Sequence, residues 1–135
     1  MEIIAWSEEL SVGVMAIDEE HKKLIAMIND LGDAMSRGEG RKAVANILSR
    51  LTEYTRGHFF REENLFNLYN YPEKETHKKE HAAFVDKVSQ FTDDYNKGNV
   101  TLSLSIMKFL RHWIIEHIMK SDKRYMDCFK EHGLT

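Results

Sequence analysis

Histidine stands out among the residues that could carry chemistry, because the chain contains 7 histidines in 135 residues. His58 and Glu62 lie four residues apart, and so do His77 and His81. This spacing places both members of a pair on the same face of a helix. A single core-facing histidine is more often a hydrogen-bonded structural residue than a ligand. Imidazole is nevertheless the commonest metal ligand, so the pattern predicts a metal site if the histidines meet in space.

Four stretches of the sequence have the periodicity of amphipathic helices, with apolar residues at steps of three and four. Joined by short loops, four such helices most simply form a bundle. The fold class expected is therefore all-α, an up-down-up-down four-helix bundle preceded by an N-terminal arm. The expected helices cover about 18–37, 41–67, 72–97 and 101–120.

Capping residues suggest where these helices begin and end. Asp18 is the expected N-cap of the first helix, and Gly38 and Gly40 follow its end. Pro72 suits the first position of the third helix, where a missing backbone N–H costs nothing. Gly98 closes that helix.

Histidine lies in register with the apolar stripe of every expected helix, so these histidines should point into the core. In an antiparallel bundle, the starts of the first and third helices lie beside the ends of the second and fourth. Six polar residues should then meet at one end of the core: His21, His58, Glu62, His77, His81 and His117.

A metal explains this convergence better than mutual hydrogen bonding does. Each buried polar group without a partner costs roughly 1–3 kcal/mol, and the sum approaches the whole stability of a domain, about 5–15 kcal/mol. Five imidazoles also exceed what one tetrahedral zinc accepts. The pattern therefore predicts two metal ions.

Carboxylates that bridge two metals would hold the pair and offset its charge. Glu62 is one candidate, and Asp122 is the natural second because it follows His117 closely. A step of five residues, however, turns about 140° around an ideal helix. Asp122 can reach the site only if the chain widens into a π-turn or leaves the helix near 119–121.

The ordered set of histidines and carboxylates resembles the hemerythrin family, specifically the single-domain bacteriohemerythrins. The resemblance covers nearly the whole chain, including Trp6 in the arm and the segment 58–63. All seven ligand positions of the family have a match at the corresponding residue type and interval: His21, His58, Glu62, His77, His81, His117 and Asp122.

The resemblance implies a four-helix bundle that binds dioxygen reversibly at two non-haem irons. It implies that His77, His81 and His117 hold one iron and that His21 and His58 hold the other, which keeps an open position. Glu62 and Asp122 would bridge the pair beside an oxo or hydroxo group.

Apolar neighbours of these ligands are suited to a dry dioxygen pocket, although the same residues also suit a core. They are Leu24, Phe59, Trp113, Ile114 and Ile118. Ferritin-like di-iron oxidases use Glu-x-x-His motifs, and this sequence contains none. A histidine-rich, carboxylate-poor pair favours dioxygen carriage, storage or delivery over an enzyme.

Two alternatives remain open at this stage. One is a sensor module that responds to dioxygen or iron, although no fused output domain is expected after the bundle. The other is a peroxidase or a nitric-oxide-reducing di-iron enzyme, which would need a route for protons and electrons. A dioxygen-consuming partner enzyme and the oligomeric state are not defined by the sequence. His112, Cys128 and His132 receive no role.

Composition excludes several other classes of function. Nineteen basic against 22 acidic residues give a net charge of −3, which provides no basic field for nucleic acid. The N-terminus lacks the features of a signal peptide, no apolar run is long enough for membrane insertion, and one cysteine fits a reducing compartment. We expect a cytoplasmic, single-domain chain over 1–135, with an arm over about 1–17, in which Trp6 and Ile3 pack on the bundle, the bundle over about 18–120 and a C-terminal tail.

Overall fold

The computed structural model describes residues 4–98 and 102–135, and it confirms the all-α fold class. Over these residues the chain forms helices and connecting turns, with no strand. The elements, in chain order, are η1 (Glu8–Leu10), α1 (Met15–Ser36), α2 (Gly40–Leu68), α3 (Lys74–Asn96), α4 (Leu102–Glu116), η2 (His117–Asp122) and α5 (Met126–Glu131). Here η1 is a 3-10 helix and η2 is a π-helix.

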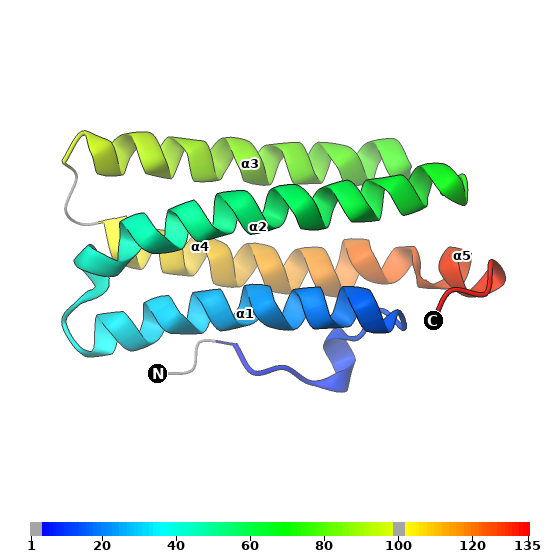
Figure 1. Ribbon diagram of the computed structural model, residues 1–135, viewed down its shortest axis with the longest axis horizontal. Helices are drawn as coiled ribbons and strands as arrows, with labels where there is room; N and C mark the ends of the chain where they lie inside the picture. Colours follow the sequence, from blue (N-terminus) through cyan, green and yellow to red (C-terminus); the bar gives the residue numbers. More distant parts are fainter. Residues whose placement is uncertain (1–3, 99–101) are drawn as a thin grey trace.

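The four long helices run alternately up and down, as the sequence predicts (Figure 1). α1 packs on α2, α2 on α3, and α4 on both α1 and α3. The starts of α1 and α3 therefore lie at the same end of the bundle as the ends of α2 and α4. The short helix α5 lies at this end too (Figure 1).

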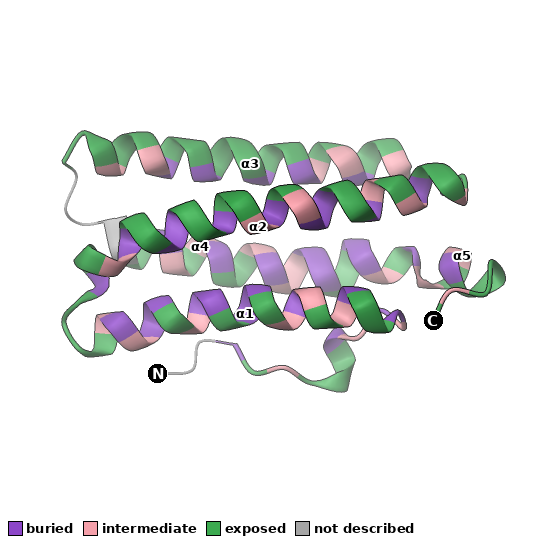
Figure 2. Cartoon of the chain, viewed as in Figure 1, coloured by how far each residue is buried: buried purple, intermediate pink, exposed green. Residues whose placement is uncertain are grey.

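Each long helix buries the apolar stripe predicted from its periodicity. Figure 2 shows buried residues following the inner sides of the helices, with exposed residues outside. Ile28, Leu31, Leu51, Ile106 and Leu110 are among the fully buried side chains. At roughly 25 cal/mol for each Å² of apolar surface removed from water, this shared core is the main force that holds the helices together.

Two predicted helix starts are wrong. α1 begins at Met15, with Val14 as N-cap, because Asp18 acts from inside the helix rather than before it. Its carboxylate accepts hydrogen bonds from Val12 N at 2.8 Å and from Ser11 Oγ at 2.5 Å. Asp18 thus ties the arm back to the first turn of α1.

The third helix begins at Lys74, two residues later than expected. Pro72 lies instead in a turn that the bond from Lys74 N to Tyr71 O closes at 3.2 Å. The preceding Asn70 adopts a left-handed φ of 52°, a conformation that asparagine tolerates better than most residues. Gly38, with φ of 73°, does separate α1 from α2, whereas Gly40 is the first residue of α2.

The arm and the tail both pack on the bundle. Trp6 is partly buried against the core, and Lys22 Nζ lies 5.1 Å from the centre of its ring. Ile3 lies outside the described residues, and so does Thr101, where the fourth helix was expected to begin. The expected tail contains α5, whose Phe129 is fully buried.

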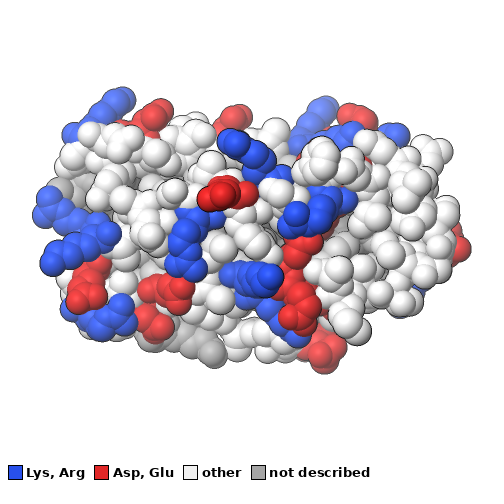
Figure 3. Space-filling view, in the orientation of Figure 1, with Lys and Arg blue, Asp and Glu red and all other residues white. Residues whose placement is uncertain are grey.

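The surface supports the exclusions made from composition. Figure 3 shows basic and acidic side chains interspersed on the visible face. Among the helices that the structure describes, none is both long and apolar enough to cross a membrane.

Candidate metal centre

Seven buried side chains converge at one end of the bundle, and they are the seven that the sequence singles out. They come from α1, α2, α3 and the π-helix η2. Their ligand atoms form two groups, each with all atoms within 4.8 Å of one another. One group is Glu62, His77, His81, His117 and Asp122, and the other is His21, His58 and Glu62. We refer to these seven residues as the ligand cluster.

The π-helix explains how Asp122 reaches the ligand cluster. η2 extends from His117 to Asp122, and its wider turn brings the two side chains to the same side. His117 Nε2 lies 2.9 Å from Asp122 Oδ1. The structure thus decides between the two alternatives in favour of a π-turn, a feature that is frequent at functional sites.

Asp122 lies between the two groups of histidines. Its Oδ1 is 2.9 Å from the Nε2 atoms of both His77 and His117. Its Oδ2 is 3.1 Å from His21 Nε2. One carboxylate therefore presents one oxygen to each group, which is the arrangement of a bridging ligand.

Glu62 spans the same two groups from α2. Its Oε1 is 3.2 Å from His81 Nε2 and 3.6 Å from His58 Nε2. Its Oε2 is 3.8 Å from His21 Nε2. The two carboxylates together are placed to hold a pair of cations.

The unsatisfied atoms of the ligand cluster fit metal ions. No hydrogen bond within the described chain satisfies Nε2 of His21, His77, His81 or His117, Oε1 of Glu62, or either oxygen of Asp122. Such buried orphans are costly unless something else pairs with them. Two atoms that each lie about 2.1 Å from one ion at right angles are about 3 Å apart, which matches the N–O separations here. The donor set of imidazole and carboxylate suits iron among other transition metals.

Three further carboxylates orient the histidines from outside the ligand cluster. Glu20 Oε2 is 2.9 Å from His58 Nδ1, and Glu63 Oε2 is 2.8 Å from His81 Nδ1. Glu80 Oε2 is 3.1 Å from His117 Nδ1. A carboxylate on Nδ1 directs the Nε2 lone pair toward a metal and raises the basicity of the ligand.

Periodicity alone did not reveal these outer carboxylates. Glu20, Glu63 and Glu80 each lie next to a cluster residue in sequence. Each one, however, contacts a histidine on a different element. Glu20 is itself held by Arg61, whose Nε donates to Glu20 Oε1 at 2.8 Å.

Charges in the ligand cluster shift the pKa values of its members. Burial alone would lower the pKa of His117, but Asp122 and Glu80 outweigh it and raise that pKa to about 10. Burial likewise opposes protonation of His58, yet the neighbouring Glu62 raises its pKa above the ordinary value. Burial would raise the pKa of Asp122, but His117 holds it well below its usual range. The metal-free site therefore pairs protonated imidazoles with ionised carboxylates.

Tyr125 is a site residue that the sequence did not indicate. Its hydroxyl donates a hydrogen bond to Glu62 Oε2 at 2.6 Å, and the residue is fully buried. Burial and the nearby carboxylate of Glu62 raise the pKa of this phenol well above its usual value. A buried tyrosine three residues beyond Asp122 was the available signal, but its direction depends on the π-turn.

Aromatic and aliphatic side chains cover the inner side of the ligand cluster. Trp113 stacks on His117 at 4.2 Å between ring centres, and Phe59 stacks on His81 at 3.8 Å. The other residues expected to line a dioxygen pocket are buried in the same core: Leu24, Ile114 and Ile118.

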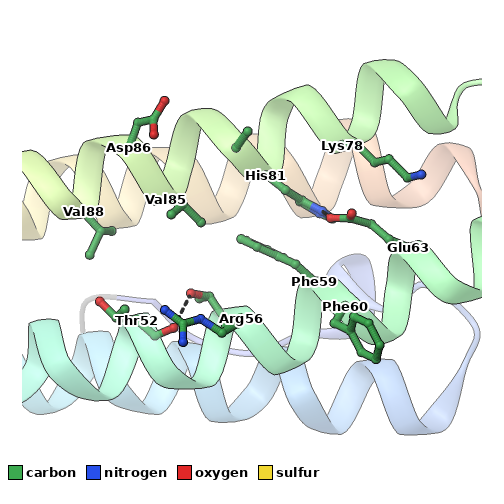
Figure 4. Close-up of a pocket in the computed structure, with 12 residues that line it drawn as sticks. Thr52, Arg56, Phe59, Phe60, Glu63, Lys78, His81, Val85, Asp86 and Val88 are labelled. Atoms are coloured by element: carbon green, nitrogen blue, oxygen red, sulfur yellow. Dashed lines mark hydrogen bonds and ion pairs between the residues drawn. The ribbon is translucent and has the colours of Figure 1, made fainter.

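An open pocket lies beside this shell, in the groove between α2 and α3 (Figure 4). Its volume is about 440 Å³, and its lining includes Phe59, His81, Val85 and Val88. Figure 4 shows Phe59 reaching into the space between the two helices near His81. We call this space the α2–α3 pocket.

The residues left without a role lie outside the ligand cluster. His112 and His132 are exposed, and His132 Nδ1 is 2.8 Å from Cys128 O. Cys128 is a free, partly buried thiol that packs against the core.

Comparison with known proteins agrees with the fold and the ligand cluster. The Hemerythrin HHE cation binding domain family matches residues 12–129. The chain is 32% identical over 127 residues to a bacteriohemerythrin of Pseudomonas aeruginosa (strain LESB58), covering 94% of this chain and 82% of that protein. It is 31% identical over 132 residues to a bacteriohemerythrin of Clostridium acetobutylicum, covering 93% of this chain and 100% of that protein.

A solved structure supports the same assignment. The crystal structure of a wild-type hemerythrin superposes with a TM-score of 0.84 at 28% identity, covering 93% of this chain and 96% of the other. Its four-helix arrangement and the family match over residues 12–129 lead to one conclusion: this chain belongs to the hemerythrin family.

Proposed function

We propose that this protein binds dioxygen reversibly at a pair of irons and so carries, stores or delivers it. The observation that carries the proposal is the set of buried, unpaired ligand atoms between two histidine groups and two carboxylates. The family match to a cation-binding domain and the names of its bacteriohemerythrin relatives support the same reading.

The ligand cluster divides naturally between two ions. His77, His81 and His117 would hold one iron, and His21 and His58 would hold the other, with fewer protein ligands. Glu62 and Asp122 would bridge the pair, together with an oxo or hydroxo group. When bound, two ferrous ions supply the two electrons that reversible dioxygen binding requires.

The chain's own residues would keep this reaction reversible. The outer carboxylates hold the imidazoles in one orientation. Phe59, Trp113 and Ile114 present apolar surface toward the ligand cluster, together with Leu24 and Ile118. An apolar lining admits dioxygen while it excludes water, and so it limits the supply of protons that would drive irreversible oxidation.

Anaerobic reconstitution tests the proposal. Metal-free protein is loaded with Fe²⁺, its iron content is measured, and visible spectra are recorded as dioxygen is added and then removed. We expect two irons per chain and a charge-transfer band that appears and disappears reversibly. Rapid irreversible oxidation, or turnover of added peroxide or nitric oxide, would instead assign an enzyme. Protein that takes up no iron would overturn the proposal outright.

Delivery can be separated from sensing by the same preparation. A carrier should release dioxygen as its free concentration falls, with its oligomeric state and partner binding unchanged. A sensor should change one of these on dioxygen binding, which sedimentation of the loaded and unloaded forms would detect. The cytoplasmic location and the existence of a dioxygen-consuming partner enzyme stay predictions.

A further inference from the structure

The four oxygens of the two central carboxylates are not equivalent. Glu62 Oε2 accepts a hydrogen bond from the Tyr125 hydroxyl at 2.6 Å. Glu62 Oε1 and both oxygens of Asp122 have no hydrogen-bond partner in the described part of the chain. One oxygen of four thus interacts with a protein donor.

The hydrogen-bonded oxygen is the one that faces His21. Glu62 Oε2 is 3.8 Å from His21 Nε2, whereas Oε1 is 3.2 Å from His81 Nε2. A donor on Oε2 fixes the rotation of the carboxylate about its terminal bond. It therefore determines which oxygen of Glu62 each histidine group meets.

Packing holds the Tyr125 ring in place. The ring stacks on Phe129 at 4.5 Å between centres and lies 5.5 Å from Phe66 and 5.7 Å from His77. Tyr125 also follows the π-helix that ends at Asp122, so one distortion of the chain positions both side chains. The hydroxyl is fully buried, and water does not compete for its hydrogen bond.

We propose that Tyr125 is a positioning residue that fixes Glu62 across the two histidine groups and raises the reduction potential of the irons bound there. A hydrogen bond donated to a ligand carboxylate withdraws electron density from it. Ferric iron depends on that density more than ferrous iron does, so the ferrous state is favoured. The inference rests on the proposed function in taking the bound metal to be redox-active iron.

The test compares Tyr125→Phe with Tyr71→Phe. Tyr71 is a matched control because it is also buried and donates to a carboxylate, Glu73 Oε2, at 3.1 Å. Redox titration of the iron-loaded proteins should give Tyr125→Phe a lower potential, with the ferric-to-ferrous ratio raised about tenfold at a fixed applied potential, or 59 mV for one electron. Tyr71→Phe should titrate like the wild type.

A stability measurement separates this role from a structural one. Both variants lose one tyrosine–glutamate hydrogen bond, so both metal-free proteins should melt at a lower temperature than the wild type. Only Tyr125→Phe should also change the potential. Equal potentials in all three iron-loaded proteins would overturn the inference while reversible dioxygen binding, and thus the proposed function, still held.

Labelling provides a second route that keeps the fold. Biosynthetic replacement of tyrosine by 3-fluorotyrosine makes the phenol a stronger donor without removing its ring. In the Tyr71→Phe background, the potential should then rise rather than fall. An unchanged or lowered potential would contradict the inference even if Tyr125→Phe failed to fold.

Discussion

Phe59 lies flat on the imidazole of His81, with 3.8 Å between ring centres and 8° between ring planes. One side of Phe59 thus covers a member of the ligand cluster, while the residue also lines the α2–α3 pocket. The stacked pair closes the bundle where an open space comes nearest to His81. We expect this closure to protect bound iron from water.

Replacing Phe59 with alanine should therefore speed the oxidation of the ferrous protein in air. The expected change is at least severalfold, measured as the rate at which the ferric spectrum develops. The variant should also lose about 3–5 kcal/mol of stability, as buried Phe→Ala changes do. Phe60→Ala is the matched control, because Phe60 lines the same pocket but is 66% exposed. If the two variants oxidised at the same rate, Phe59 would not be the barrier.

Glu20→Gln should weaken metal binding without removing a ligand. Glu20 orients His58 through its Nδ1 atom, and the loss of such a partner typically costs 10–100-fold in metal affinity. Titration of Fe²⁺ into the metal-free variant should show weaker binding of one ion, with the other little changed. Glu19→Gln provides the control, because Glu19 is exposed and contacts Lys22. Equal affinities in both variants would remove Glu20 from the site.

Iron binding should release protons, and its affinity should rise between pH 6 and pH 8. The pKa of His117 in the metal-free protein is raised to about 10 and that of His58 is raised as well, so both imidazoles hold protons at neutral pH. A metal binds only the neutral form, so each bound histidine gives up its proton. Anaerobic calorimetry in two buffers of different ionisation enthalpy measures the release, and a binding heat independent of the buffer would contradict it.

The same pKa shift has a consequence for the metal-free bundle. A raised pKa in the folded state stabilises it below the unfolded value of 6.5, and this contribution is lost as pH rises through about 10. The melting temperature of metal-free protein should therefore fall from pH 7 to pH 10 more than that of the iron-loaded protein. Parallel curves for the two forms would show that His117 is not charged in the metal-free state.

Chelation of iron should lower the melting temperature, because the metal binds the folded state only. Ligand at 100 times its dissociation constant contributes about 2.7 kcal/mol. His77→Ala should likewise hold fewer than two irons per chain, whereas His112→Ala should keep both, since His112 is exposed and outside the ligand cluster. A His77→Ala protein with a full complement of iron would exclude His77 as a ligand.

The sequence by itself determined the class of fold and where the histidines meet. A helix turns about 100° per residue, so steps of three and four place His58, Glu62, His77 and His81 on inward faces. Alternating helix directions then bring them to one end. Helix ends were less well determined, because contacts such as that of Asp18 with the arm involve residues outside the helix.

Tertiary structure alone decided how Asp122 and Tyr125 join the site. A step of five residues from His117 is out of phase with an ideal helix, and only the π-helix from His117 to Asp122 brings it back. The outer carboxylates Glu20 and Glu63 also lie on helices other than those of their histidines. Periodicity describes which way a residue faces on its own helix, whereas a contact between helices depends on how their axes pack, and that is a property of the folded chain.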